Sequence, residues 1–341
     1  MKKIKHIIFI ILVTTIQFAN AQDFHVAQYD IAYQYMNPAQ TGSFDQSFGD
    51  YKVQMLTRSQ WRSMGIKPFF TTYLSYDMPY IIKDKKIGLG AFLINNNTGS
   101  GNMNTTQFML SGSYNILDKK ALGRHVLTTG LQIGVLYKTF NTKNLYYDNQ
   151  YSYSVDGGSF DKSVTSGETY SSLNLTRFDA NIGIYYKMID ITKKYHPYVG
   201  FSMAHLTKPN EAFFGDISRM PIKIRFYGGC DLKVNEEIDV TPRFLYLNQA
   251  KAYEITAGIL ASYLLKEQKI KLLFGSDYRY KDAVIINAGA KNDALSLRFS
   301  YDINSSYLNK YTNGRGAWEI SLSYTGVKGK SFKDAILSRY F

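Results

Sequence analysis

Ser202 and His205 form the pair of residues best suited to nucleophilic catalysis, in which an imidazole takes the proton of a serine hydroxyl. Both fall in a segment, 196–206, that is predicted to be a strand, and a strand points successive side chains to opposite faces. A separation of three residues therefore places the two side chains on opposite faces. Because no other motif carries a mechanism, the sequence predicts that the chain is not an enzyme.

Metal and redox chemistry also lack the residues that they need. The histidines after residue 21, which are His25, His125, His196 and His205, are too scattered to form a metal cluster by spacing. Cys230 is the single cysteine, so no internal disulfide can form. Glycine-rich phosphate loops and paired catalytic carboxylates are missing, and we expect neither a cofactor nor a metal.

The elements that would position these residues are strands, because apolar and polar residues alternate along most of the chain. Leu295, Leu297, Phe299, Tyr301 and Ile303, for example, alternate with polar residues. Such a period of two gives one apolar and one polar face. When it recurs in segments of about ten residues, it predicts an all-β fold, a transmembrane antiparallel β-barrel of the outer membrane with a polar lumen.

We expect about fourteen strands, an even number as in most closed single-chain barrels. They are predicted at 51–62, 69–80, 86–96, 104–116, 124–139, 176–188, 196–206, 222–234, 238–248, 251–265, 269–281, 283–291, 294–304 and 316–326. The 29 tyrosines and 21 phenylalanines suit aromatic girdles at the two membrane interfaces.

The first residues resemble an export signal. Residues 1–21 contain three lysines, a short apolar run and an Ala-Asn-Ala cleavage site, which is typical of a signal peptide. We expect residues 22–50 to lead into the barrel or to plug it, and residues 51–341 to form the barrel and a C-terminal tail. The formal charge is +13, and removal of the three leader lysines would leave +10. Without a basic run or a binding motif, this charge favours anionic lipid and acidic partners over nucleic acid.

Connection lengths predict which end of the barrel faces the cell exterior. Short charged turns such as 83–85, 235–237, 266–268 and 292–293 follow even-numbered strands, as periplasmic turns do. Longer segments, at 97–103, 140–175, 207–221 and 305–315, follow odd-numbered strands and would face outward.

Several polar residues share the lumenal face of the predicted strands. In the first strand these are Gln54, Arg58, Gln60 and Arg62, with Lys52 at its start, and in the thirteenth Arg298 and Asp302. They would either line a path for a peptide or solute, or form an internal charge network that holds a filled barrel rigid. We favour the network, because buried polar groups need partners whatever the function.

Short elements in a fixed order resemble the PorP/SprF family of outer-membrane proteins of the type IX secretion system, found in the Bacteroidetes. They are Gln28-Tyr29, Asn37-Pro38-Ala39 followed by Gly42, and Arg58-Ser59-Gln60-Trp61. Further similar segments lie at 178–183, 198–209, 300–305, which includes Tyr301 and Asp302, and 318–324. The resemblance covers nearly the whole chain after the leader.

This resemblance implies a role in exporting or anchoring a cell-surface adhesin, including adhesins that drive gliding motility. It implies as partners a secreted adhesin with a C-terminal sorting domain, periplasmic or lipoprotein components of the machinery, and outer-membrane lipid. A passive channel for small solutes is the alternative, because fourteen strands lie between small filled barrels and wide porins.

Several candidate contact residues also have purely structural explanations. Asn37, Pro38 and Gly42 suit a turn that enters or plugs the lumen, and Trp61 suits a membrane interface. In the long segment 140–172, Tyr146, Tyr147, Tyr151, Tyr153 and Tyr170 stand among small polar residues. That composition is typical of protein-binding loops, although the rings could equally fold onto the barrel rim.

Overall fold

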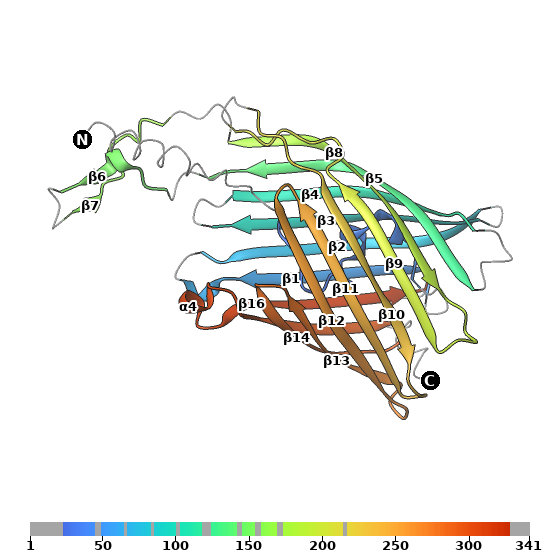
Figure 1. Ribbon diagram of the computed structural model, residues 1–341. Helices are drawn as coiled ribbons and strands as arrows, with labels where there is room; N and C mark the ends of the chain where they lie inside the picture. Colours follow the sequence, from blue (N-terminus) through green and yellow to red (C-terminus); the bar gives the residue numbers. More distant parts are fainter. Residues whose placement is uncertain are drawn as a thin grey trace, which may run out of the picture.

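The alternating segments form fourteen strands that close into one antiparallel barrel (Figure 1). The computed structural model describes residues 23–44, 49–64, 67–82, 85–99, 103–117, 124–141, 145–153, 158–168, 173–213 and 217–327. The predicted leader and most of the predicted tail lie outside these residues. Among the described residues, no helix is long and apolar enough to cross a membrane.

The barrel strands agree with the prediction, and no strand end differs from it by more than two residues. They are β1 (Tyr51–Gln60), β2 (Phe69–Ile82), β3 (Lys85–Thr98), β4 (Met103–Asn115), β5 (His125–Thr139), β8 (Asn174–Met188), β9 (Tyr195–Ala204), β10 (Lys223–Lys233), β11 (Ile238–Gln249), β12 (Ala252–Leu265), β13 (Ile270–Arg279), β14 (Ala283–Lys291), β15 (Leu295–Asn304) and β16 (Arg315–Gly326). Each pairs with the next along the chain, and β1 pairs with β16 from Tyr51 opposite Gly326 to Gln60 opposite Ala317.

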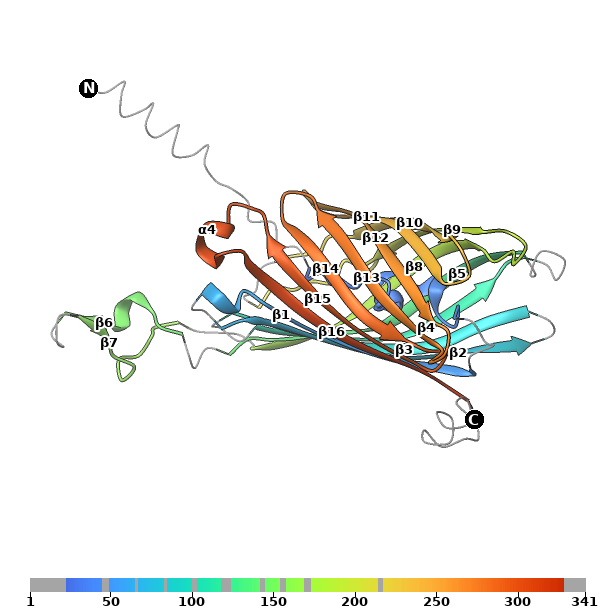
Figure 2. The same cartoon turned by 90° about the horizontal axis from the view of Figure 1, so that it is seen from below.

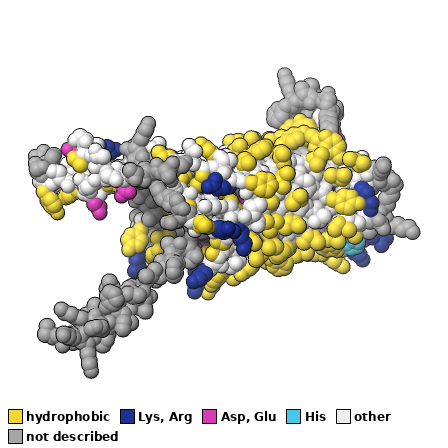
Figure 3. All heavy atoms as spheres, turned by 90° about the horizontal axis from the view of Figure 1, so that it is seen from above, with side chains coloured by type: hydrophobic (Ala, Val, Ile, Leu, Met, Phe, Trp, Pro, Cys, Tyr) yellow, Lys and Arg dark blue, Asp and Glu magenta, His cyan; other side chains and the backbone are white. Residues whose placement is uncertain are grey.

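The two faces of the wall follow the period of two. Leu74, Leu110 and Leu131 are about half exposed on the outside, whereas lumenal Gln54, Arg58 and Arg298 are buried. Figure 3 shows a broad band of hydrophobic side chains over the middle of the wall, with Lys and Arg toward its ends. This arrangement is typical of an outer-membrane barrel, in which a hydrophobic band faces the lipid and the two ends of the barrel face water.

Both ends of the barrel can be named from the connections. We call the end where Tyr51 meets Gly326 the short-turn end, and the opposite end the long-loop end. A small sheet of β6 (Tyr151–Ser152) and β7 (Ser159–Phe160) projects beyond the long-loop end (Figures 1 and 2). Two short helical elements, η3 (Arg62–Met64) and α4 (Asn309–Thr312), lie at the same end.

Residues 23–44, the N-terminal segment, lie inside the barrel and supply much of its core. The segment contains two single turns, α2 (Tyr33–Met36) and η1 (Pro38–Gln40), and both are buried. Six of its residues pack against apolar residues that the strands turn inward. These six are Val26, Tyr29, Ala32, Tyr35, Met36 and Ala39.

Glycines in the wall make room for this segment. A Cβ atom at Gly88 would lie 1.9 Å from the carbonyl oxygen of Thr41, and one at Gly130 would lie 2.3 Å from the carbonyl carbon of Pro38. Since no side chain fits such a gap, the sequence uses glycine where two backbones approach closely. The N-terminal segment and the wall are thus fitted to each other.

Candidate functional site

The lumen near the long-loop end contains a network of buried ion pairs. Arg58 of β1 donates from Nη1 to Glu319 of β16 at 2.7 Å and from Nη2 to Asp302 of β15 at 2.9 Å. All three side chains are at most 2% exposed. The β1 and β16 register places Arg58 opposite Glu319, so closure of the barrel creates the first of these pairs.

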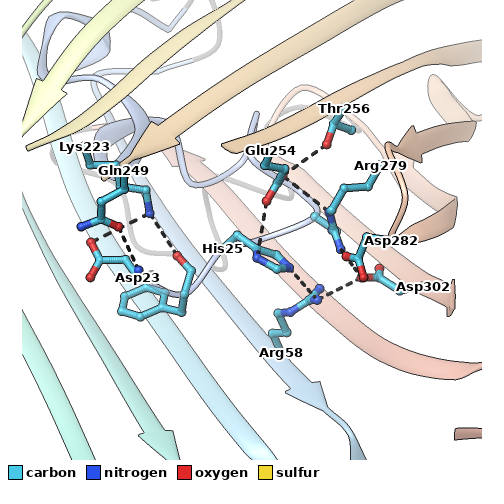
Figure 4. A network of polar contacts seen from close by, with 12 residues as sticks. Asp23, His25, Arg58, Lys223, Gln249, Glu254, Thr256, Arg279, Asp282 and Asp302 are labelled. Atoms are coloured by element: carbon cyan, nitrogen blue, oxygen red, sulfur yellow. Dashed lines mark hydrogen bonds and ion pairs between the residues drawn. The ribbon is translucent and has the colours of Figure 1, made fainter. Parts of the chain in front are cut away.

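The network continues across the lumen to the N-terminal segment (Figure 4). Arg279 contacts Asp302 at 3.1 Å, Asp282 at 2.9 Å and Glu254 at 3.5 Å. His25 lies between this group and Arg58, with Nδ1 3.4 Å from Glu254 and Nε2 3.4 Å from Arg58 Nη2. Burial, followed by the charges of Arg279 and Arg58, keeps the pKa of His25 well below its usual value, so the imidazole is neutral.

A second group joins the same segment to the middle of the lumen. Asp30 accepts from Arg298 at 2.7 Å and contacts Arg243 at 3.1 Å, while Arg243 also pairs with Asp277 at 2.6 Å. Arg298 donates to Gln28 as well. Because these carboxylates are bound by guanidinium groups, they hold the chain together and are not free to act as bases.

His205 fixes the start of the N-terminal segment. Its Nδ1 lies 2.6 Å from Asp179 and its Nε2 lies 2.8 Å from Asp23. Burial alone would lower the pKa of His205, but the charge of Asp23 and the hydrogen bonds to both carboxylates raise it to about 9. At neutral pH His205 is therefore an imidazolium between two carboxylates.

The prediction that Ser202 and His205 lie on opposite faces of one strand is wrong, because both side chains have partners in the lumen. Strand β9 ends at Ala204, two residues before the prediction, because His205 adopts a left-handed backbone with φ of 60° and turns into the lumen. Ser202 donates to the carbonyl oxygen of Met36 at 2.6 Å, so the two side chains serve different partners. Among the residues that the structure describes, no cluster of His, Cys, Asp or Glu could hold a metal.

Asn37, Pro38 and Gly42 are buried against the wall. Asn37 donates to the carbonyl oxygens of Ile184 and Phe201, and its Oδ1 accepts from the backbone of Ala39 at the start of η1. Gly42 has φ of 64°, and its N–H donates to Asp77 at 2.5 Å. In this arrangement all three residues are buried inside the barrel.

The predicted site residues that follow Arg58 in the sequence lie in different places in the structure. Gln60 and Trp61 line a cavity of about 400 Å³ at the long-loop end, and Trp61 packs edge-on against Phe69 with ring centroids 4.7 Å apart. The prediction that Arg62 faces the lumen is wrong, because β1 ends at Gln60 and Arg62 lies exposed in η3. Tyr301 faces outward, opposite Trp318 of β16.

The four tyrosines that the structure describes in the long segment lie in its projecting part, residues 145–168. Tyr153 is 84% exposed, and Tyr146 and Tyr151 each lie about 5 Å from Phe160 between ring centroids. Tyr147 is half-buried, and Tyr170 lies outside the described residues. The strands β6 and β7 of this segment stand beyond the barrel (Figure 2), and Tyr146 and Tyr151 pack against Phe160 within the segment.

Sequence reasoning missed most partners of the lumenal arginines. Asp23, His25 and Asp30 lie in a segment without periodicity, so the neighbouring sequence contains no signal that they lie in the lumen. Arg243, Asp277 and Arg279 share the parity of buried neighbours, and that signal could have identified them.

Comparisons with solved structures agree with the barrel fold. The toluene transporter TbuX of Ralstonia pickettii has 10% identity and a TM-score of 0.53, with 86% of this chain and 92% of that chain covered. The toluene transporter TodX of Pseudomonas putida has 12% identity and a TM-score of 0.49, with 89% and 94% covered. The first supports the fold alone, and the second is too distant to support any conclusion. No curated protein matches the chain.

A family model described as type IX secretion system membrane protein PorP/SprF matches residues 18–324. The match covers the N-terminal segment and nearly all of the barrel, and the barrel has the lipid-facing band and polar interior of outer-membrane proteins. The chain therefore belongs to the PorP/SprF family of type IX secretion system membrane proteins, as an integral β-barrel of the outer membrane.

Proposed function

We propose that this barrel, without enzymatic activity, supports the export and cell-surface attachment of a partner adhesin that carries a C-terminal sorting domain. Gliding motility is one process that such attachment would serve. The family match along residues 18–324 carries the proposal. Periplasmic or lipoprotein components of the secretion machinery would be the other partners.

The filled lumen favours attachment over passage of solutes. The N-terminal segment meets the wall on several sides: Thr128 and Ser113 donate to the carbonyl oxygens of Ala39 and Thr41 at 2.6 Å, and Gln132 donates to that of Gln34 at 2.8 Å. Such contacts, together with the contacts of the neutral His25 and the ion pairs of Asp30, oppose displacement of the segment by a solute. We propose that residues 22–50 act as a plug after removal of residues 1–21 as a signal peptide.

The projecting segment is the proposed adhesin contact. Its exposed rings, Tyr146, Tyr151, Tyr153 and Phe160, form a cluster in which neighbouring centroids lie about 5 Å apart. Large, rigid aromatic side chains bind protein at low entropic cost. We place this segment at the cell exterior, because the long connections of such barrels face outward.

An affinity pull-down of the tagged protein from solubilised outer membranes tests the proposal. We expect one large surface protein to be recovered by the native chain and to be lost when Tyr151, Tyr153 and Phe160 are replaced by Ser. The matched control replaces Tyr307 and Tyr311, which are also exposed and lie near α4 at the same end. A barrel that captures nothing and conducts ions steadily in a planar bilayer would instead establish the channel alternative.

A further inference from the structure

The short-turn end contains a cavity of about 810 Å³ whose lining is strongly basic. Four lysines come from four strands: Lys52 of β1, Lys187 of β8, and Lys271 and Lys291, which face each other on the neighbouring strands β13 and β14. Lys266 and Lys269, from the turn between β12 and β13, complete the set. The proposed adhesin contact lies at the opposite end of the barrel and does not use this cavity.

The alternation of side chains along the strands places the strand lysines on the lumenal face. Lys52, Lys187 and Lys271 each lie two residues from a buried lumenal side chain, which are Gln54, Tyr185 and Leu273. Residues two apart in a strand share a face. The cavity is therefore a vestibule of the lumen, and the basic groups do not face the lipid.

Positive charge exceeds negative charge in this vestibule. Lys187 pairs with Asp231 at 2.8 Å, Lys271 with Asp239 at 2.5 Å and Lys266 with Glu237 at 3.1 Å. Within the described part of the chain, Lys52, Lys269 and Lys291 form no ion pair, and Lys52 instead lies 5.2 Å from the ring centroid of Tyr33. The lining also contains Arg298, which pairs with Asp30, and Asp293, so its seven basic side chains face two carboxylates. A cavity in which one sign of charge predominates between low-dielectric walls concentrates ligands of the opposite sign.

We propose that this vestibule binds an acidic segment of a partner polypeptide. Its volume lies in the range of pockets that enclose a drug-sized ligand, which corresponds to a few residues. Apolar side chains of Ile31, Phe44, Leu260 and Leu264 share the lining, so apolar residues between the acidic ones would also be received. The inference rests on the proposed function only in taking the partner to be a polypeptide of the secretion machinery.

Two other occupants fit less well. The C-terminal residues of this chain, 328–341, are themselves basic, with four Lys or Arg residues and one Asp, and would be repelled. Anionic lipid would meet the outer wall first, whereas these lysines face the lumen. Charge complementarity within an enclosed vestibule therefore favours an acidic peptide.

Fluorescence anisotropy with a labelled hexaglutamate peptide tests the site on the purified full-length protein in a non-ionic detergent. We expect hexaglutamate to bind more tightly than hexaglutamine and to weaken as salt is raised. The double variant Lys269→Glu, Lys291→Glu should weaken binding by about tenfold or more, because it places like charges against the peptide.

The control variant is Lys251→Glu, Lys281→Glu, which makes the same charge change at the long-loop end. Lys281 matches Lys269, since both are turn residues with positive φ, and Lys251 is exposed. Retention of heat-modifiable migration in gels establishes that each variant barrel is folded.

Equal weakening by the two double variants would overturn the site, as would equal affinity for hexaglutamine. Displacement of hexaglutamate by inorganic phosphate at an equal concentration of charge would show that the vestibule is a small-anion site. Displacement by phosphatidylglycerol micelles would show that it is a lipid site. Either result would overturn the proposal that the ligand is a polypeptide. Because the assay needs no adhesin, its outcome is independent of the pull-down.

Discussion

The two ends of the lumen use charge in different ways. Near the long-loop end, Arg58 and Arg279 are each bound by two or three carboxylates and are at most 3% exposed. At the short-turn end, lysines line a water-accessible cavity, and some form no ion pair among the described residues. The planar guanidinium group suits fixed, multidentate pairing, whereas the ammonium group remains hydrated on a flexible stem. The comparison supports a division in which the arginines of one end hold the barrel together and the lysines of the other end are left to receive a ligand.

Removal of an arginine at the long-loop end should have the largest effect on stability. In Arg58→Ala, Glu319 and Asp302 would remain buried with a lost partner, so we expect a cost of about 3–5 kcal/mol in the free energy of unfolding. Denaturant unfolding followed by tyrosine fluorescence measures it. Arg62→Ala is the control, because exposed Arg62 should change stability by less than about 0.5 kcal/mol. Similar costs for the two variants would contradict the assigned network.

The imidazolium of His205 should make stability fall as the pH rises. The folded chain keeps this proton up to a pKa of about 9, whereas the unfolded chain releases it near pH 6.5. The contribution is therefore complete below pH 6.5 and lost as the pH passes 9, and amounts to about 3 kcal/mol.

Unfolding measured from pH 6 to 10 tests this dependence. His205→Gln should flatten the decrease, while His125→Gln, which changes a histidine outside the lumenal network, should leave it intact. If the free energy of unfolding of His205→Gln fell by the same amount as the pH rises, the pH dependence would have to come from another group.

A smaller cost is expected where the N-terminal segment is held by close backbone contact instead of charge. In Gly88→Ala the new methyl group would collide with the carbonyl oxygen of Thr41, at a cost of about 1–3 kcal/mol. Displacement of the segment should also raise the conductance in planar bilayers. Gly112→Ala on the next strand is the matched control, because a Cβ atom there has no other atom within 4 Å. Unchanged conductance and stability in Gly88→Ala would show that the segment can shift without opening the lumen.

The sequence predicted the barrel well because strand periodicity is a local property. Every barrel strand was predicted to within two residues, and the parity of Arg58, Arg298 and Asp302 correctly indicated the lumen. By contrast, the pairing of Arg58 with Glu319 joins residues 261 positions apart and depends on barrel closure. Periodicity reports which face a side chain occupies, and it does not report which partner it meets.

The departures from the prediction have causes that strand periodicity does not report. β9 ends early because the carboxylates of Asp23 and Asp179 draw His205 inward, and Asp23 belongs to a distant segment. The small sheet of β6 and β7 was missed because two-residue strands are too short to show a period. The early end of β9 thus depends on a contact between segments that are far apart in the sequence.

The smallest effect on stability is expected when a lysine of the vestibule is replaced. This replacement is the most direct test of the difference between the arginines of the long-loop end and the lysines of the short-turn end. Lys291 is exposed to the cavity and forms no ion pair among the described residues, so Lys291→Gln removes a hydrated charge and leaves no buried carboxylate behind. We expect the free energy of unfolding to change by less than about 0.5 kcal/mol, as at ordinary surface sites. The same denaturant unfolding assay applies, with Arg58→Ala as the reference. A cost near that of Arg58→Ala would mean that the lysines hold the barrel together, and it would contradict the proposed division between a structural end and a ligand-binding end.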